Sequence, residues 1–312
     1  MTVTLSPPRT TARSPRPRGT MYIWLFLTPT VLLYGAFTLY PIVSSYVYSL
    51  TDWNGFDTGR SFIGVANYQE VLADPMFWSS FRLTLTFMLF AVPLQVLATL
   101  LIAILLNSPR MPLRKLFRTA LFLPVVTTTA IIGVVMQFVF DPASGPVNLA
   151  LRDLGLVTDG IDFLGQSSTA LGTTIAVYVW KWFGITLVYW LAALQTVPND
   201  VYEAARLDGA GALALLRHIT MPLLKPFLVI ITLLSIEASL QVFDLVLTMT
   251  GGGPFYSTEV IEVYIYRWAF AATIPRLGYA SAAAVLFGLF VCLVGMLQLL
   301  AIRATRRTRR AA

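Results

Sequence analysis

The stretch VYEAARLDGAGALALLRHITMP occupies residues 201–222 and separates two long apolar runs, at 171–194 and 223–248. A helix needs about 20 apolar residues to cross the hydrocarbon core of a bilayer, and both runs reach that length. The stretch between them is rich in Ala, Leu, Glu and Arg, which favour helices. The sequence therefore predicts two membrane spans joined by a structured connection.

Six apolar runs of this kind occur along the chain. Hydrophobic residues make up 57% of the 312 residues and charged residues only 12%, whereas soluble domains have about 25% charged residues. We therefore expect an all-α, polytopic transmembrane bundle that forms one domain at 21–302. The expected spans are 21–46, 81–106, 119–140, 171–194, 223–248 and 278–302.

The basic residues lie mainly on one side of these spans. Sixteen of the 22 Lys and Arg residues precede the first span, follow the sixth, or fall between the second and third or the fourth and fifth. Because basic loops stay in the cytoplasm, both termini and the connection at 198–222 are expected there. Residues 1–20 and 303–312 are then basic cytoplasmic tails, and the first, rich in Pro, Thr and Arg, is expected to be disordered.

The connection at 198–222 has the pattern of two short helices. Asp200 is positioned to cap the first helix, with Glu203 reaching back as in a capping box. Gly209 and Gly211 favour a left-handed turn after it, and a second helix follows at 212–219. On the residue pattern alone, a simple capping role for Glu203 and a docking role for the whole segment are equally compatible with the sequence.

The spacing of this segment resembles the EAA loop of ABC importer permeases. That motif reads EAA, three residues, G, nine residues, I, one residue, LP, and here only Met221 departs from it, in place of Leu. The resemblance implies docking onto a cytoplasmic ATPase, with Asp208 adding charge beside the motif. The implied coupling residues are Glu203, Ala204, Ala205, Asp208, Gly209, Ile219 and Pro222.

Other stretches are similar to the carbohydrate branch of this family, from about residue 22 to residue 302. They include LTPTVLLYGAFTLYPIVSSYVYSLTDW in the first span, FIGVANYQEVL after it, VWKWFG in the fourth span and FDLVLTMTGGGP after the fifth. The first-span pattern most resembles the first of the two permeases in maltose-type and glycerol-phosphate-type importers.

The resemblance implies a cell-membrane permease for a sugar or sugar-like solute. It also implies a second permease subunit, two ATPase subunits and an extracytoplasmic solute-binding protein. The chain has no Walker A pattern, so ATP and Mg are expected on the ATPase and no cofactor on this chain. We do not expect it to be an enzyme or to bind nucleic acid.

Charged and polar side chains inside the expected spans are candidates for the solute path. Lys181, Glu237 and Asp244 fall within spans, and Gln241 shares the i, i+4, i+7 periodicity of the two acids. Charges in a membrane face the bundle interior or a watery path. Three interpretations remain open. These residues line a sugar path, or they are structural, through an ion pair of Lys181 with Glu237 or Asp244 or through polar contacts across the permease dimer, or they serve gating alone.

The sequence Gly252-Gly253-Pro254 follows the fifth span on the outer side. We interpret it as a tight turn or gate next to the surface that meets the binding protein. A phosphate-binding loop is disfavoured because no basic residue or helix start accompanies the glycines.

Two rival functions remain. A stand-alone secondary transporter or channel for a small polar solute would lack a docking loop. A membrane enzyme would need a nucleophile–base pair or a metal cluster, and no such pattern appears. The single cysteine, Cys292, excludes an internal disulfide, and the single histidine, His218, excludes a zinc site of the usual kind.

Overall fold

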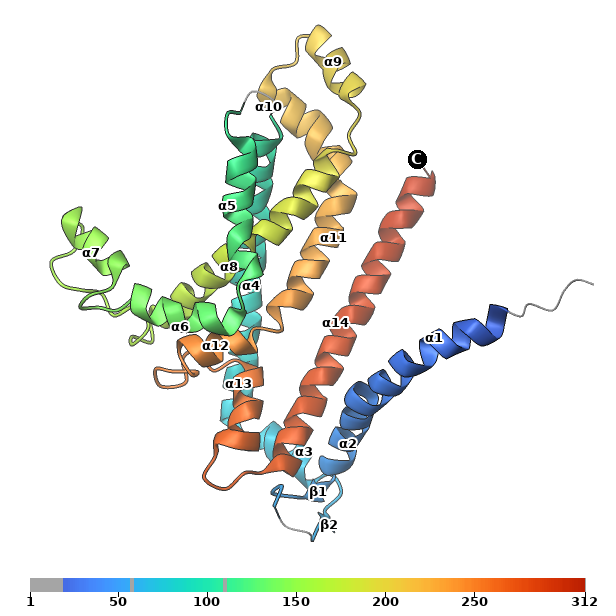
Figure 1. Cartoon of the computed structure of the whole chain (residues 1–312), viewed down its shortest axis with the longest axis vertical. Helices are drawn as coiled ribbons and strands as arrows, with labels where there is room; N and C mark the ends of the chain where they lie inside the picture. Colours follow the sequence, from blue (N-terminus) through green and yellow to red (C-terminus); the bar gives the residue numbers. More distant parts are fainter. Residues whose placement is uncertain (1–18, 57–58, 109–110, 312) are drawn as a thin grey trace, which may run out of the picture.

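The computed structural model describes residues 19–56, 59–108 and 111–311, and this part of the chain is mainly helical (Figure 1). The expected helical fold is confirmed, with one short two-stranded ladder added. The elements are α1 Gly19–Tyr34, η1 Gly35–Leu39, α2 Tyr40–Tyr48, β1 Thr51–Asp52, β2 Ser61–Phe62, α3 Ala66–Ala73, α4 Pro75–Asn107, α5 Arg114–Val126, α6 Thr129–Val139, α7 Pro146–Asp153, α8 Ala170–Leu194, α9 Asn199–Leu207, α10 Ala212–Leu215, η2 Leu216–Thr220, α11 Met221–Ser239, α12 Phe243–Met249, α13 Ile261–Tyr266, η3 Arg267–Ala271 and α14 Leu277–Ala311, where η marks a π-helical turn.

Within the described ranges, five helices are long and apolar enough to cross a membrane, or six if the bent pair α5 and α6 counts as one span. The five are Tyr22–Tyr48, Pro75–Asn107, Ala170–Leu194, Ala212–Ser239 and Leu277–Leu300. The expected tail at 1–20 lies outside the described residues except for its last two, which begin α1. α14 continues into the expected tail at 303–312 and ends at Ala311.

The helices α4 and α8 form the centre of the bundle, with α5 and α11 beside them (Figure 1). Asp74 caps the first turn of α4 by accepting a hydrogen bond from the Met76 N–H (2.8 Å). Trp190 is fully buried in α8 and donates from Nε1 to the carbonyl of Val96 in α4 (3.1 Å). A buried indole N–H is usually hydrogen-bonded, so this contact fixes how the two central helices meet.

The expected span at 119–140 is not one straight helix, because α5 and α6 are separate helices bent by 103°. α5 ends at Val126, and Thr127 has an extended backbone (ψ 144°). The last carbonyls of α5 accept hydrogen bonds from Lys181 of α8. This side chain satisfies carbonyls that a continuing helix would have paired with its own N–H groups, so the helix can end inside the bundle.

The expected span at 223–248 differs at both ends. Its helix already begins at Ala212, because α10, η2 and α11 are continuous, and it ends at Ser239. α12 follows as a separate short helix. The Glu262 carboxylate accepts a hydrogen bond from the Phe243 N–H (2.8 Å). It thereby satisfies an N-terminal donor of α12, which stabilises a new helix start at this point.

The chain segment before α3 and the start of α14 form the end of the molecule opposite α9 (Figure 1). β1 and β2 pair as a short antiparallel ladder. The buried Asn67 donates to the carbonyls of Ser49 (2.9 Å) and Thr51 (3.0 Å). α1 is exposed along its length and leaves the bundle, whereas α2 lies beside α14.

Candidate functional site

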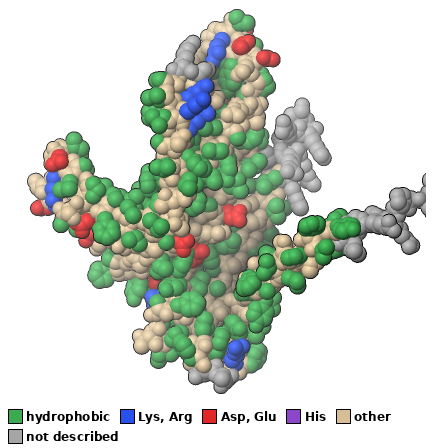
Figure 2. All heavy atoms as spheres, in the orientation of Figure 1, with side chains coloured by type: hydrophobic (Ala, Val, Ile, Leu, Met, Phe, Trp, Pro, Cys, Tyr) green, Lys and Arg blue, Asp and Glu red, His purple; other side chains and the backbone are tan. Residues whose placement is uncertain are grey.

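The helix α9 projects from one end of the molecule (Figure 1). It has no buried residue, and Leu207 at its end is 90% exposed. Figure 2 shows Lys and Arg side chains gathered near this end and hydrophobic side chains over much of the face between the two ends. α9 therefore stands clear of the bundle, where another protein could contact it.

Gly209 ends α9 in the predicted left-handed conformation, with φ +82°. The Ala210 N–H donates to the Ala205 carbonyl (2.9 Å) and the Gly209 N–H to the Arg206 carbonyl (3.1 Å). This pair of bonds is the Schellman arrangement, which satisfies carbonyls at the helix end. The turn that follows the EAA residues is therefore defined by backbone hydrogen bonds.

The expected capping box is wrong, because the N-cap is Pro198 and no side chain caps α9. Asp200 lies in the first turn, where a negative charge favours the helix N-terminus. The second expected short helix, at 212–219, is also wrong as a separate element, because it is the first part of the long helix Ala212–Ser239. One projecting helix on the end of a span therefore replaces the expected pair.

The predicted coupling residues all lie in this region. Glu203 and Ala204 are exposed on α9. Tyr202 anchors the helix, since its hydroxyl lies 3.0 Å from Oγ1 of the buried Thr220 at the base of α11. The remaining predicted residues are Ala205 in α9, Asp208 and Gly209 in the turn, Ile219 in η2 and Pro222 in α11.

A cavity of about 330 Å³ lies between α4, α8 and α11. The Gln95 amide faces it from α4 and donates to Thr186 Oγ1 (2.7 Å), while its buried Oε1 has no partner. The lining residues are Gln95, Trp182, Ile185, Thr186, Tyr189, Leu234, Ser235, Glu237, Ala238 and Gln241. Amide, hydroxyl and carboxylate groups beside aromatic rings can bind a polyhydroxylated solute.

The structure brings together only two of the four predicted path residues. Glu237 and Gln241 both line the cavity and are exposed. Asp244 is exposed on α12, beyond the helix break at Leu240. Since the helix ends before Gln241, the expected single helical face does not reach Asp244.

Lys181 does not line the cavity, and its expected ion pair with Glu237 or Asp244 is absent. Its Nζ donates to the carbonyls of Pro124 (3.0 Å), Val125 (3.1 Å) and Thr127 (2.6 Å). Within the described ranges, the ion pairs are Arg267–Glu259 and Arg276–Glu70. Both belong to the end opposite α9, so neither crosses the cavity.

Sequence reasoning missed the contributions of α4 and of the second half of α8 to the cavity. Gln95 is a polar residue inside an apolar span, and this is a signal that could have identified it. Thr186 and Tyr189 gave no such signal, because both residue types are ordinary in membrane helices. Their place in the cavity depends on how α8 packs against α4 and α11.

The sequence Gly252-Gly253-Pro254 forms a tight turn after α12. Gly252 has φ +87°, and a Cβ there would lie 3.2 Å from Val263 Cγ1. Thr258 closes the turn by donating from Oγ1 to the Gly253 carbonyl (2.7 Å). Phe255, at the tip, is 92% exposed, so this turn presents an aromatic side chain outward.

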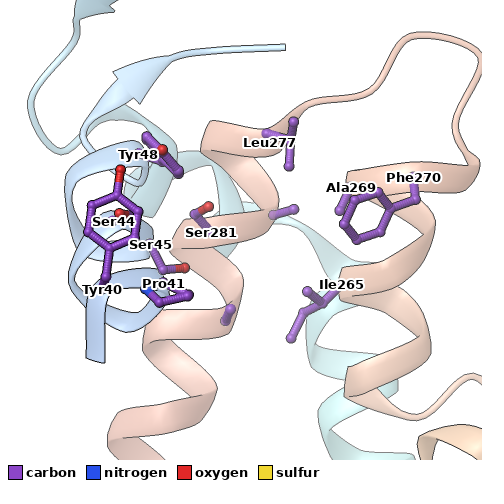
Figure 3. Close-up of a pocket in the computed structure, with 12 residues that line it drawn as sticks. Tyr40, Pro41, Ser44, Ser45, Tyr48, Ile265, Ala269, Phe270, Leu277 and Ser281 are labelled. Carbon is purple, nitrogen blue, oxygen red and sulfur yellow. The ribbon is translucent and has the colours of Figure 1, made fainter. Parts of the chain in front are cut away.

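A second groove, of about 370 Å³, lies between α2, α13–η3 and α14 (Figure 3). Tyr40, Ser44 and Ser45 face it from α2, and Ile265 and Phe270 face it from the opposite wall. Its lining offers hydroxyl groups but no carboxylate or amide. The cavity between α4, α8 and α11 is therefore the better candidate for a solute site.

Comparison with known proteins gives consistent matches over most of the chain. Residues 76–307 match the family described as binding-protein-dependent transport system inner membrane component. The lactose transport system permease protein LacF of Rhizobium radiobacter is 33% identical over 90% of this chain and 93% of its own length. The arabinooligosaccharides transport system permease protein AraP of Bacillus subtilis is 30% identical over 88% of this chain and 87% of its own.

The fold is also similar to that of solved transporters. A chain from a bacterial ABC transporter involved in the import of the acidic polysaccharide alginate superposes with a TM-score of 0.77 and 23% identity, over 91% of this chain and 96% of that chain. A chain from a bacterial alginate ABC transporter in complex with an alginate pentasaccharide-bound periplasmic protein superposes with a TM-score of 0.76 and 22% identity, over 92% of this chain and 95% of that chain.

Proposed function

The chain belongs to the family of binding-protein-dependent transport system inner membrane components, and from this premise we propose that it is the permease subunit of an ABC importer for a sugar or sugar-like solute. The projecting α9 helix, with Glu203 and Ala204 exposed on it, is the observation that carries the proposal, because a stand-alone transporter or channel has no need of a projecting docking helix. Sugar transport by LacF and AraP supports the solute class.

The proposed partners are a second permease subunit, two ATPase subunits and an extracytoplasmic solute-binding protein. ATP and Mg belong on the ATPase. The exposed Leu207 and the charged residues of α9 would contact that ATPase, and the link from Tyr202 to Thr220 would pass its movement to α11. Such coupling requires contacts that differ between two states, and a hydrogen-bonded helix end is suited to make them.

The proposed topology has six spans, with the bent pair α5 and α6 counted as one, and both termini in the cytoplasm. The distribution of basic residues supports this orientation. α9 is then cytoplasmic, and the end with β1, β2, α3 and the Gly252 turn faces outward. The exposed Phe255 would belong to the surface that receives the binding protein.

The proposed solute path passes through the cavity between α4, α8 and α11. Glu237 and Gln241 would bind hydroxyl groups, while Trp182 and Tyr189 would contact the C–H faces of the sugar. Asp244, exposed beyond the helix break, would meet the solute at the mouth of the path.

Purification through a tag on this chain tests the proposed assembly. Chromosomally expressed ATPase and permease subunits should copurify, and a sugar-loaded binding protein should stimulate ATP hydrolysis by the purified complex in lipid. Copurification should weaken when Leu207 is replaced by Asp. Recovery of the chain alone, with normal solute uptake by that chain in vesicles, would instead favour the stand-alone transporter.

A further inference from the structure

Lys181 is an ammonium group enclosed by backbone carbonyls in the middle of the bundle. Its side chain is 1% exposed. The three oxygens that accept its hydrogen bonds belong to Pro124 and Val125, in the last turn of α5, and to Thr127, in the bend that follows. All three donors of the ammonium therefore have a partner.

These hydrogen bonds satisfy carbonyl groups at the point where α5 ends and the chain bends. The carbonyls at the end of a helix have no partner within it and carry partial negative charge. In a membrane such groups must be satisfied by the protein itself. The Lys181 ammonium supplies a positive charge and three donors at the place where α5 stops, so a neutral side chain at this position would leave carbonyls without partners.

The bend also requires α5 and α8 to approach closely, and Gly184 permits this. A Cβ on Gly184 would lie 2.6 Å from the carbonyl oxygen of Leu121 and from Cα of Phe122. Gly184 follows Lys181 by three residues, so both face the same side of α8. One face of α8 thus fixes both the position of α5 and the point where it ends.

Beyond the bend, α6 runs away from α5 toward α7 and packs on α12 (Figure 1). A Cβ on Gly133 would lie 2.9 Å from Cβ of Thr248, and Gln137 Nε2 donates to the Thr248 carbonyl (2.7 Å). α12 follows Gln241, which ends the lining of the cavity on the side away from α9. The angle between α5 and α6 therefore determines where α6 lies against α12, the helix that follows the cavity residue Gln241.

We propose that Lys181 is a positioning residue that fixes the bend between α5 and α6 and thereby holds α6 against α12 at the end of the solute cavity. This inference rests on the proposed transport function for its consequence, but its geometry can be tested without transport. Trp182 connects Lys181 to the cavity, since its ring lies 4.7 Å from Lys181 Nζ and the residue also lines the cavity.

Cross-linking in the assembled complex tests the geometry. Cysteines replace Gln137 and Thr248 in a Cys292→Ser background, and a short bifunctional thiol reagent joins them. We expect Lys181→Met to slow this cross-linking by about fivefold or more, the lower end of typical coupling between sites, while Lys181→Arg restores it. A control pair, Tyr202→Cys with Thr220→Cys, spans the α9 anchor and should react equally in all backgrounds.

A transport measurement tests the consequence. In the native-cysteine complex, Lys181→Met should raise ATP hydrolysis in the absence of sugar and lower the amount of solute moved per ATP, whereas Lys181→Arg should behave as wild type. Wild-type cross-linking and coupling in Lys181→Met would overturn the proposal. If the wild-type complex moves no sugar while the cross-linking difference remains, the proposed function fails and the positioning role stands.

A second variant covers the case in which the Lys181→Met protein does not fold or accumulate. Lys181→Gln keeps amide donors without the charge and serves as the second variant, with cross-linking expected to be intermediate. If both neutral variants fail to accumulate and only Lys181→Arg survives, Lys181 is needed for assembly and the positioning role is rejected. Wild-type cross-linking in Lys181→Gln, with Lys181→Met absent, would reject it as well.

Discussion

Gly209 is the residue on which the shape of the α9 turn depends most, because its φ of +82° is unfavourable for any residue with a Cβ. Left-handed backbone costs such a residue about 1–2 kcal/mol. We expect Gly209→Ala to loosen the turn and to reduce ATPase binding, measured by copurification, without loss of the chain from the membrane. Gly211→Ala is the matched control, since φ there is −72° and the space around it is open. Equal copurification of the two variants would contradict the role of the turn.

Glu262 gives the structure a defined pH dependence. It lies in α13, outside the candidate spans, and burial raises its pKa from 4.5 to about 7, although hydrogen bonds from the Phe243 and Val242 N–H groups act in the opposite direction. The folded state therefore holds a proton that the unfolded state releases between pH 4.5 and about 7. The contribution of Glu262 to stability should fall as pH rises through this window.

Thermal unfolding of the detergent-solubilised chain at pH 5 and pH 8 measures this effect. The wild type should lose more stability between the two pH values than Glu262→Gln, which cannot ionise but can still accept from Phe243. An identical pH dependence in both proteins would mean that Glu262 titrates normally, and the buried carboxylate at the start of α12 would have to be reconsidered.

The last turns of α11 and the residue Gln241 just after it line one side of the proposed path. Replacing Glu237 by Gln or Gln241 by Ala should raise the apparent KM for uptake about two- to tenfold, because a lost neutral hydrogen bond costs about 0.5–1.5 kcal/mol. Initial uptake rates over a range of solute concentrations measure it. Leu223→Ala, an exposed position on the same helix outside the cavity, should leave KM unchanged. An unchanged KM in both cavity variants, at normal complex levels, would exclude this path.

The helices also mark the limit of what the sequence can predict. Apolar length identified α4, α8 and α14 because each is continuous, and glycine identified the left-handed end of α9. The breaks after α5 and α11 could not be predicted, since they depend on Lys181 and Glu262, each distant in sequence from the helix end it satisfies. Part of the cavity lining was predicted. Glu237 and Gln241 were found as polar residues in a span, whereas Tyr189 lines the cavity only because of how α8 packs against its neighbours.

For the molecule as a whole, the proposed orientation predicts which surfaces a membrane-impermeant thiol reagent can reach. In a Cys292→Ser background, Ser168→Cys should be labelled from outside intact cells and Ala210→Cys only after permeabilisation. Both positions belong to the part of the chain that the structure describes: Ser168 precedes the first residue of α8, and Ala210 follows α9, beyond the other end of α8. Labelling of Ala210→Cys but not Ser168→Cys in intact cells would reverse the orientation, and α9 could no longer meet a cytoplasmic ATPase.

The most direct test of the central claim is ATP-driven uptake by proteoliposomes. Vesicles that contain this chain with its copurified permease and ATPase subunits receive ATP inside and a radiolabelled sugar with its binding protein outside. The account predicts accumulation that requires both ATP and binding protein and that is abolished when the α9 turn is disrupted by Gly209→Pro. Equal uptake by vesicles containing this chain alone, without ATP, would contradict it.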